Sequence, residues 1–363
     1  MTELFAATAP VFKVDGSVSK ALARDVSVLR IEEATDGLKT LELRLLAEGP
    51  RPNEKEEGQL YLDGEGIDLG KSIEVSIGPA DAARIVFTGA VSAIEASFTT
   101  GVMPSVTAFA EDALMKLRMT RRMKTYENVT DADLARAIAA EHGLRVSASA
   151  EGPTYKVVQQ WNQSDLAFLR ERARLIQAEL WFVDDTMHFA TRGHRTATTL
   201  SLIMGGDLLE AQLRADLAHQ RTAVTVSGYD AARREAVTEE VGADVIQAEI
   251  SGGRTGSAVL QQVFGERASF RVRTDPLVAG EAQAWAQAEM LRRARGFVTV
   301  SGMTNGTADM IVGSRLSLDR VGAPFTGEGY YVTRVCHTYD LVDGFRTHFE
   351  AERATLNEAG SAQ

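Results

Sequence analysis

Apolar and polar residues alternate in short runs over the first third of the chain. Leu41, Leu43 and Leu45 are separated by charged residues, and Ile73 and Val75 begin another run of the same kind. A period of two residues predicts strands that bury one face. Several such strands with turns between them predict a first antiparallel β-barrel over residues 1–113.

One set of short motifs occurs twice, in the same order. The first copy reads Gly70-x-x-Ile73, Phe87-Thr88-Gly89 and Thr107-x-Phe109, and the second reads Gly313-x-x-Leu316, Phe325-Thr326-Gly327 and Thr347-x-Phe349. The repeat predicts a second, similar antiparallel β-barrel from residues 196–230 and 297–356. The repeated positions singled out are Gly70, Phe87, Gly89, Phe109, Gly313, Phe325, Gly327 and Phe349.

Between the two copies the apolar residues recur at helical intervals. Thr130, followed by an acid three residues later, predicts a helix start, because its hydroxyl can accept a hydrogen bond from an exposed amide. Ser164 and Asp165 predict the start of a second helix, whose arginines are expected mostly on the outside. A hairpin with a two-residue turn is expected at residues 184–185. Residues 114–195 are therefore predicted to form an α/β insertion domain.

A second insertion is predicted at residues 231–296, within the second barrel. Its clearest element is a helix from Glu281 to Arg295, with an acid at its start and three arginines at its end. Both charge biases favour a helix, because its dipole is positive at the amino end. The insertion is therefore predicted to be helical, and residues 357–363 are predicted to be a flexible tail.

The basic residues concentrate in one segment. The segment contains Lys116, Arg118, Arg121, Arg122 and Lys124. Met115, Leu117 and Met119 alternate with its polar residues, which predicts a strand with one apolar and one basic face. Such a face is either simply solvated, or it docks an acidic surface of a partner or a neighbouring subunit. Both interpretations stay open at this stage.

Composition narrows the classes of function. The chain has 363 residues, of which 44% are hydrophobic and 25% charged, as is typical of soluble globular proteins. The formal charge of −11 argues against nucleic acid or an anionic membrane as a main partner. No signal peptide is expected at Met1–Pro10, and no apolar run has the roughly 20 residues of a membrane helix. The single cysteine, Cys336, excludes an internal disulfide and is expected to be buried and inert.

No residue pattern indicates catalysis, a metal or a cofactor. The six histidines are scattered, and adjacent Cys336 and His337 in a strand would point to opposite faces. Neighbouring acids such as Glu56 and Glu57 do not match the two facing carboxyl groups of a glycosidase. The Gly-rich run at residues 252–256 lacks the Lys-Ser/Thr ending of a phosphate loop. We therefore expect no catalytic, cofactor-binding or metal-binding residues.

Two stretches resemble a known family. Residues Trp161 to Leu169, followed by Leu180-Trp181-Phe182, resemble the insertion-domain signature of baseplate hub proteins. The segment Ala282 to Arg295, Gly302-x-Thr304-x-Gly306, the second motif copy with Tyr330-Tyr331-Val332, and His337-x-Tyr339 resemble the last barrel of that family. Together they are similar to the phage late-control D proteins and to the amino-terminal part of valine-glycine-repeat spike proteins of type VI secretion.

The resemblance implies a structural protein and no enzyme. It implies a homotrimer whose six barrels form a pseudo-sixfold ring, a symmetry adaptor between a hexameric tail tube and a trimeric spike. The implied partners are the tail tube protein or a tube initiator, the spike, and baseplate wedge proteins. No spike repeat follows residue 356, so a separate spike polypeptide is expected.

The resemblance also implies where the protein acts. It implies assembly in the bacterial cytoplasm and residence in the baseplate of a phage or another contractile injection particle. Two alternatives stay open: a tail-associated peptidoglycan hydrolase, and a receptor-binding or carbohydrate-binding tail module.

Overall fold

The computed structural model describes residues 9–50, 57–64, 66–78 and 83–358. Most of the amino-terminal segment and most of the predicted flexible tail lie outside these ranges. The chain forms two compact units. The first comprises Met1–Met115, Met303–Val312 and Arg334–Phe349, and the second comprises Lys116–Gly302, Gly313–Thr333 and Glu350–Gln363.

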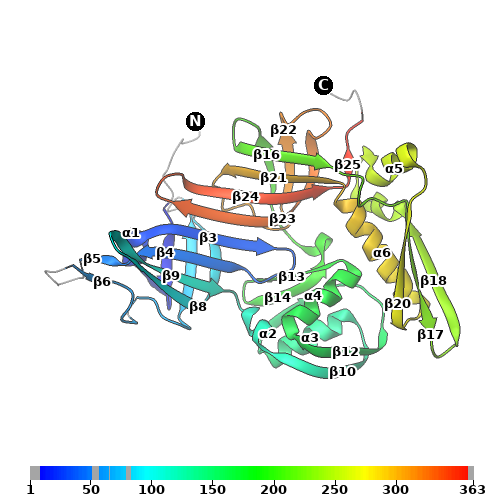
Figure 1. The fold of residues 1–363 in the computed structure, drawn as a ribbon, viewed down its shortest axis with the longest axis horizontal. Coiled ribbons are helices and arrows are strands. Elements are labelled where there is room, and N and C mark those ends of the chain that lie inside the picture. Colours follow the sequence, from blue (N-terminus) through cyan, green and yellow to red (C-terminus); the bar gives the residue numbers. More distant parts are fainter. Residues whose placement is uncertain (1–8, 51–56, 65, 79–82, 359–363) are drawn as a thin grey trace. The chain divides into compact units, whose positions relative to one another are not determined.

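The elements follow one another along the chain as labelled in Figure 1. The first stretch contains β1 (Val11–Val14), β2 (Ser17–Val18), α1 (Lys20–Asp25), β3 (Val26–Ala34), β4 (Thr40–Leu46), β5 (Glu48–Pro50), β6 (Glu57–Gln59), β7 (Ser72–Ile77), β8 (Arg84–Thr99), β9 (Val102–Glu111) and α2 (Met115–Met119). The middle contains β10 (Arg121–Val129), α3 (Asp131–Glu141), β11 (Arg145–Ala148), β12 (Tyr155–Ser164), α4 (Asp165–Ile176), β13 (Ala178–Val183), β14 (Thr186–Thr191), η1 (Arg192–His194), β15 (Thr199–Ile203) and β16 (Leu208–Ala215).

The last part contains β17 (Ala223–Asp230), β18 (Glu235–Gly242), η2 (Ala243–Glu249), β19 (Arg254–Thr255), α5 (Gly256–Phe264), β20 (Ala268–Pro276), α6 (Ala279–Arg295), β21 (Val298–Asn305), β22 (Arg315–Asp319), β23 (Gly327–Asp340), β24 (Gly344–Arg353) and β25 (Thr355–Leu356). Strands account for 51% and helices for 21% of the structure, so the predicted mainly-β fold is confirmed.

Two sets of six strands share one order. The first set runs β3–β4–β9–β8–β7–β1, and the second runs β16–β21–β24–β23–β22–β15. Each strand of the first set thus has a counterpart that takes the same place in the second set and the same place in chain order. One pairing differs, because β1 is antiparallel to β7 whereas β15 is parallel to β22. Neither set closes on itself within the described residues, so the two barrels stay a prediction.

The core of the first unit is formed by side chains from the strands of the first set. Strands β3, β4, β7, β8 and β9 each contribute apolar residues to one cluster, which includes Phe12, Leu43, Val75 and Phe87, all at most 1% exposed. The second half of β23 also belongs to this unit, where it pairs with β3 in antiparallel register. The alternation of apolar and charged residues in β4 follows from this packing, since one face of the strand lies in the core.

The two helix starts predicted from capping residues are confirmed. The Thr130 hydroxyl accepts a hydrogen bond from the Asp133 amide at 3.2 Å, and the Asp133 carboxylate accepts one from the Thr130 amide at 3.0 Å. At α4 the Ser164 hydroxyl accepts from the Ala167 amide at 3.2 Å. These bonds satisfy amides that have no partner within a helix. The two-residue turn at residues 184–185 is also confirmed, since both residues have left-handed backbone angles.

The strand predicted over the basic segment is wrong at its start. Residues Met115–Met119 form the helix α2, and only the part from Arg121 onward is a strand. The Asp112 carboxylate accepts hydrogen bonds from the nearby Leu114 amide and from the distant Lys39 amide, both at 2.9 Å, and so turns the chain after β9. Leu117 is the one buried residue of α2, so this short helix is anchored by a single apolar side chain.

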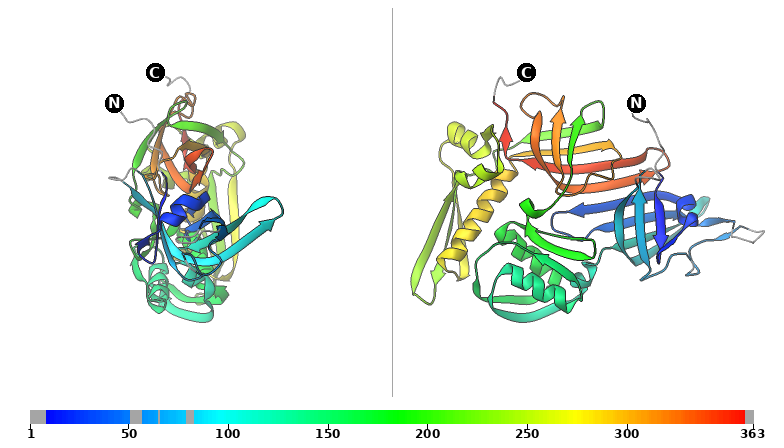
Figure 2. Two further views of the ribbon diagram at one scale, coloured as in Figure 1. Left: turned by 90° about the vertical axis from the view of Figure 1, so that its left-hand side faces the viewer. Right: turned by 180° about the vertical axis from the view of Figure 1, so that it is seen from behind.

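The insertion at residues 231–296 is not only helical. Strands β18 and β20 lie within it and pair with β17 in a three-stranded sheet, so β17 is not one of the strands of the predicted second barrel. Val224, Val226, Val237 and Val241 of this sheet are buried against α6, which lies along it in Figures 1 and 2. The valines therefore act as strand residues despite the Ala- and Glu-rich sequence around them. The helix predicted from Glu281 is confirmed, although it begins at Ala279.

Candidate functional site

The predicted basic segment is divided between two faces. Lys116, Arg118 and Arg121 are exposed, whereas Arg122 and Lys124 are half-buried. Since side chains alternate across a strand, Arg121 and Arg122 point to opposite sides of β10. The five side chains therefore do not form one continuous basic face.

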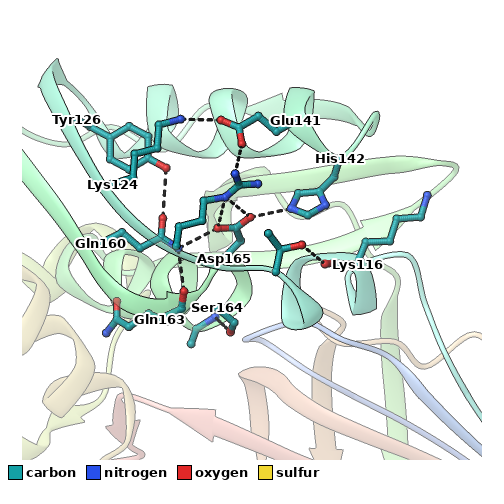
Figure 3. A network of polar contacts seen from close by, with 12 residues as sticks. Lys116, Lys124, Tyr126, Glu141, His142, Gln160, Gln163, Ser164 and Asp165 are labelled. Atoms are coloured by element: carbon teal, nitrogen blue, oxygen red, sulfur yellow. Dashed lines mark hydrogen bonds and ion pairs between the residues drawn. The ribbon is translucent and has the colours of Figure 1, made fainter.

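The inward side of β10 carries a polar network around Asp165 (Figure 3). Asp165 is the first residue of α4, and its side chain is fully buried. Its carboxylate accepts hydrogen bonds from the Arg122 Nε at 2.9 and 3.0 Å and from the Gln160 amide at 2.8 Å. The His142 Nε2 lies 2.7 Å from one of its oxygens. The network thus joins β10, β12, the end of α3 and the start of α4.

Glu141 extends this network toward the solvent. Its carboxylate lies 2.6 Å from a terminal nitrogen of Arg122 and 2.6 Å from the Lys124 Nζ. Hydrogen bonding to Asp165 raises the pKa of Arg122. Burial, together with the charges of Asp165 and Glu141, raises the pKa of Tyr126 to about 12. Arg122 is therefore charged and Tyr126 neutral at neutral pH, which suits a structural anchor.

The outward side of β10 and β12 is exposed and carries apolar side chains among polar ones. Met123 and Trp161 are cross-strand partners, with exposed fractions of 75% and 64%. Val157 on the same side of β12 and Met119 in α2 are exposed as well. We call Met119, Met123, Val157 and Trp161 the outer apolar patch. The apolar face predicted for this segment included Met119 but not Met123, Val157 or Trp161, although Met123 alternates with Arg122 and Lys124.

The first glycines of the two motif copies have equivalent backbone environments. The Gly70 amide donates to the Val91 carbonyl at 2.8 Å, and the Gly313 amide donates to the Val332 carbonyl at 2.9 Å. Both glycines have positive φ, +80° and +95°. At Gly313 a Cβ atom would also lie 2.9 Å from the side chain of Arg195. A side chain at this position is therefore excluded twice, by backbone angle and by packing.

The Phe-Thr-Gly triplets do not occupy equivalent places. Phe87 lies in β8 opposite Val75, and Gly89 lies opposite Ile73. In the second copy Gly327 pairs with Leu318, and the half-buried Phe325 lies in the turn before β23. Leu316, the counterpart of Ile73, pairs with Tyr330, so the second triplet lies three residues further from its partner, and a bulge interrupts the pairing between Leu316 and Leu318.

The ends of the two motif copies correspond better. Thr107 and Thr347 are both buried, in the counterpart strands β9 and β24. Two residues on, Phe349 is 2% exposed, whereas Phe109 is half-buried. The threonine, more than the phenylalanine, therefore marks the same environment in both strands.

The residues considered for chemistry lie in structural settings. The His337 ring lies 3.0 Å from the Thr347 hydroxyl, and burial lowers the pKa of His337 to about 4. Cys336 is 6% exposed, and burial raises the pKa of its thiol. Within residues 9–50, 57–64, 66–78 and 83–358, no three His, Cys, Asp or Glu side chains are grouped so as to hold a metal ion. No helix in the same ranges has the length and apolarity to cross a bilayer.

The fold is similar to those of phage tail proteins with known structures. The 43 kDa tail protein of prophage MuSo2 from Shewanella oneidensis is 15% identical, with a TM-score of 0.69, over 96% of this chain and 98% of that chain. A tail protein from Neisseria meningitidis MC58 is 14% identical, with a TM-score of 0.67, over 95% of this chain and 96% of that one.

A secretion protein has a similar fold. The E. coli c3393 protein, described as a component of the type VI secretion system with structural similarity to the T4 bacteriophage tail proteins gp27 and gp5, is 13% identical. Its TM-score is 0.59, over 94% of this chain and 76% of that chain. The resemblance to baseplate hub proteins is thereby confirmed at the level of the fold. No curated protein sequence matches the chain. A family model described as the Alg8 N-terminal domain matches residues 26–340.

Proposed function

The chain belongs to the Alg8 N-terminal domain family, and we propose that it is a structural baseplate hub of a contractile tail or injection system. The observation that supports this role is the shared order of the two six-strand sets. A subunit with two similar sheet units presents two similar surfaces. Three such subunits around a threefold axis present six, which matches a hexameric ring of identical partners.

Each part of the chain has a role in this assembly. Residues 1–113 form one barrel, and residues 196–230 with 297–356, apart from β17, form the other. Strand β17 belongs with the sheet of the second insertion. Six barrels from a homotrimer make a pseudo-sixfold ring. Residues 114–195 form the α/β insertion, and residues 231–296 form a second insertion that contains β18, β20 and α6.

The ring joins a hexameric tail tube, or its initiator, to a trimeric spike, and wedge proteins surround it. The hub is made and assembled in the bacterial cytoplasm and stays in the baseplate of the particle. Its role is to transmit force and to match symmetries, without catalysis.

Oligomeric state provides the first test. Native mass spectrometry of the purified chain is expected to give three times the 39.3 kDa chain mass, and bound tube protein is expected to add its own mass to that of the trimer. Electron-microscopic class averages of the tube-bound complex should show six similar densities per ring. A monomer that stays monomeric with the tube protein present, or a ring without six similar densities, would contradict the proposal.

Deletion of the gene separates the hub from the two alternative functions. Loss of a hub should abolish tube assembly, and the wild-type gene should restore it. Loss of a receptor-binding module should instead leave intact particles that fail to attach. Zymography of the purified chain on peptidoglycan is expected to show no lysis, and a cleared band would favour the hydrolase.

Docking through the basic segment is part of this proposal. Arg122 is not a suitable position for charge reversal, because it pairs with Asp165 and its replacement would disrupt the polar network around Asp165. Lys116 and Arg121 are exposed, so Lys116→Glu with Arg121→Glu is the informative double variant. It should weaken binding of the tube or wedge partner, while Arg233→Glu, also on an exposed side chain, should not. Unchanged partner binding by the double variant would remove this segment from the interface.

A further inference from the structure

A cavity of about 410 Å³ in the second unit is lined by four arginines and two glutamates. Arg192 comes from η1, Arg295 from the end of α6, Arg315 from β22 and Arg353 from the end of β24. The acids are Glu249 and Glu352. These side chains come from segments far apart in the sequence, so the fold itself brings the four guanidinium groups together. With both carboxylates ionised, the lining carries two positive charges in excess.

Two of the arginines are neutralised within the lining. Arg192 lies 2.5 Å from the Glu352 carboxylate, and the Arg295 Nε donates to Glu249 at 2.8 Å. Burial opposes the negative charge of Glu249, but the hydrogen bonds from Arg295 outweigh it and lower the pKa of Glu249. The pair of Arg295 and Glu249 therefore stays ionised at neutral pH. The excess positive charge belongs to Arg315 and Arg353.

Arg353 is held in the cavity wall without an acid. It is 5% exposed, and one terminal nitrogen donates to the Pro324 carbonyl at 3.0 Å. Its guanidinium lies 4.5 Å from the centre of the Tyr330 ring. Its buried Nε has no hydrogen-bond partner in the described part of the chain. A buried cation with an unsatisfied donor is costly unless an anion compensates it.

Arg315 differs from the other three arginines of the lining in its exposure. It is exposed, and its guanidinium lies 4.4 Å from the centre of the Tyr331 ring. The Arg192 guanidinium lies over the same ring at 4.2 Å. In the described residues, no ion pair joins Arg315 or Arg353 to a carboxylate. Burial, together with the neighbouring charge of Arg192, lowers the pKa of Arg315 despite the partial compensation from Tyr331.

We propose that this cavity binds a small molecule that carries a phosphate group. A phosphate dianion would neutralise the two excess charges, and the planar guanidinium groups offer the paired donors that phosphate oxygens accept. The volume falls in the range of small-molecule sites and exceeds that of a bare phosphate. Several lining residues, Arg353 and Tyr331 among them, are buried, which favours a small ligand over a flat protein surface. The site goes beyond the proposed hub role and does not depend on it.

Titration calorimetry of the full chain tests the proposal, with inorganic phosphate and pyrophosphate as probes at constant ionic strength. Arg315→Gln removes one unpaired charge from an exposed position, so it should weaken pyrophosphate binding about tenfold or more. Arg214→Gln is the matched control, because its side chain is exposed and does not line the cavity. Arg353→Gln should abolish binding, provided that circular dichroism shows a native fold.

Several outcomes would overturn the site. These are the absence of binding by either phosphate probe, equal affinities for the wild type and Arg315→Gln, or equal losses in Arg315→Gln and Arg214→Gln. Malonate serves as a dicarboxylate probe in the same titration. Malonate binding in place of phosphate would overturn the assignment to phosphate. If Arg353→Gln does not fold, the comparison of Arg315→Gln with Arg214→Gln decides alone.

Discussion

Replacing Asp165 with alanine should destabilise the second unit by about 3–5 kcal/mol. The carboxylate is fully buried and receives hydrogen bonds from Arg122 and Gln160, with the His142 ring in contact. Removing it leaves a half-buried guanidinium with only Glu141, and it leaves a buried amide donor without this acceptor. It also removes a negative charge from the first turn of α4, where the helix dipole favours one.

The three tryptophans make this measurement specific. Trp161, Trp181 and Trp285 all belong to the second unit, so tryptophan fluorescence during urea unfolding reports that unit. The midpoint should fall in Asp165→Ala with little change in the slope of the transition. Asp165→Asn, which keeps the shape and two hydrogen-bonding atoms, should lose less.

A matched control and a compensating variant sharpen the test. Asp185→Asn alters an exposed acid in the turn between β13 and β14, where asparagine tolerates the left-handed backbone, so its effect should stay within about 0.5 kcal/mol. Asp165→Leu combined with Arg122→Met should recover part of the loss, because no unpaired charge stays behind. A loss below about 1 kcal/mol in Asp165→Ala would refute the view that this network anchors α3 and α4.

Three further predictions concern the first unit. Gly89→Ala should lower its stability by about 1–3 kcal/mol, because the new Cβ would lie 2.3 Å from the Glu111 carbonyl oxygen. The control is Gly280→Ala at the start of α6 in the second unit, where a Cβ would meet open space. It should leave thermal stability unchanged or raise it. His337 is neutral in the folded state with a pKa of about 4, below its unfolded value of about 6.5, so its contribution is fully present above pH 6.5 and is lost as pH falls toward 4. Protection factors for hydrogen exchange in β3, corrected for the intrinsic exchange rate at each pH, should therefore fall over that range by an amount equivalent to at most about 3 kcal/mol. His337→Gln should remove this component while leaving the opposite contribution of Asp112, whose pKa burial raises to about 6. The thiol of Cys336 should react with a disulfide reagent only in denaturant, and rapid reaction of the native protein would contradict its burial.

Local sequence determined the ends of several elements. Thr130 with Asp133, and Ser164 at α4, form capping bonds to amides only three residues away, so a short stretch of sequence contains all the information. The turn at Asp184 and Asp185 is local in the same sense. The repeated motifs also predicted two similar sheet units, and the two sets of six strands share one order.

Local sequence patterns did not predict the burial of a charged side chain or the register of one strand pair. Arg172, expected outside α4, is 8% exposed because it meets Asp131 at 2.5 Å and lies over the Tyr155 ring. The second Phe-Thr-Gly triplet has another register, because Leu316 pairs with Tyr330 and not with Gly327. Both outcomes depend on partners elsewhere in the chain, so no local pattern specifies them.

The sequence by itself thus determined the mainly-β class, the helix starts and the twofold repetition of strands, because these follow from hydrogen bonds and alternation over a few residues. Tertiary structure alone decided which charges meet. Arg122 and Asp165 are 43 residues apart, and Arg192 and Glu352 are 160 apart. Such pairs form only after the strands between them have taken their places, since the packing of those strands brings the two side chains within reach.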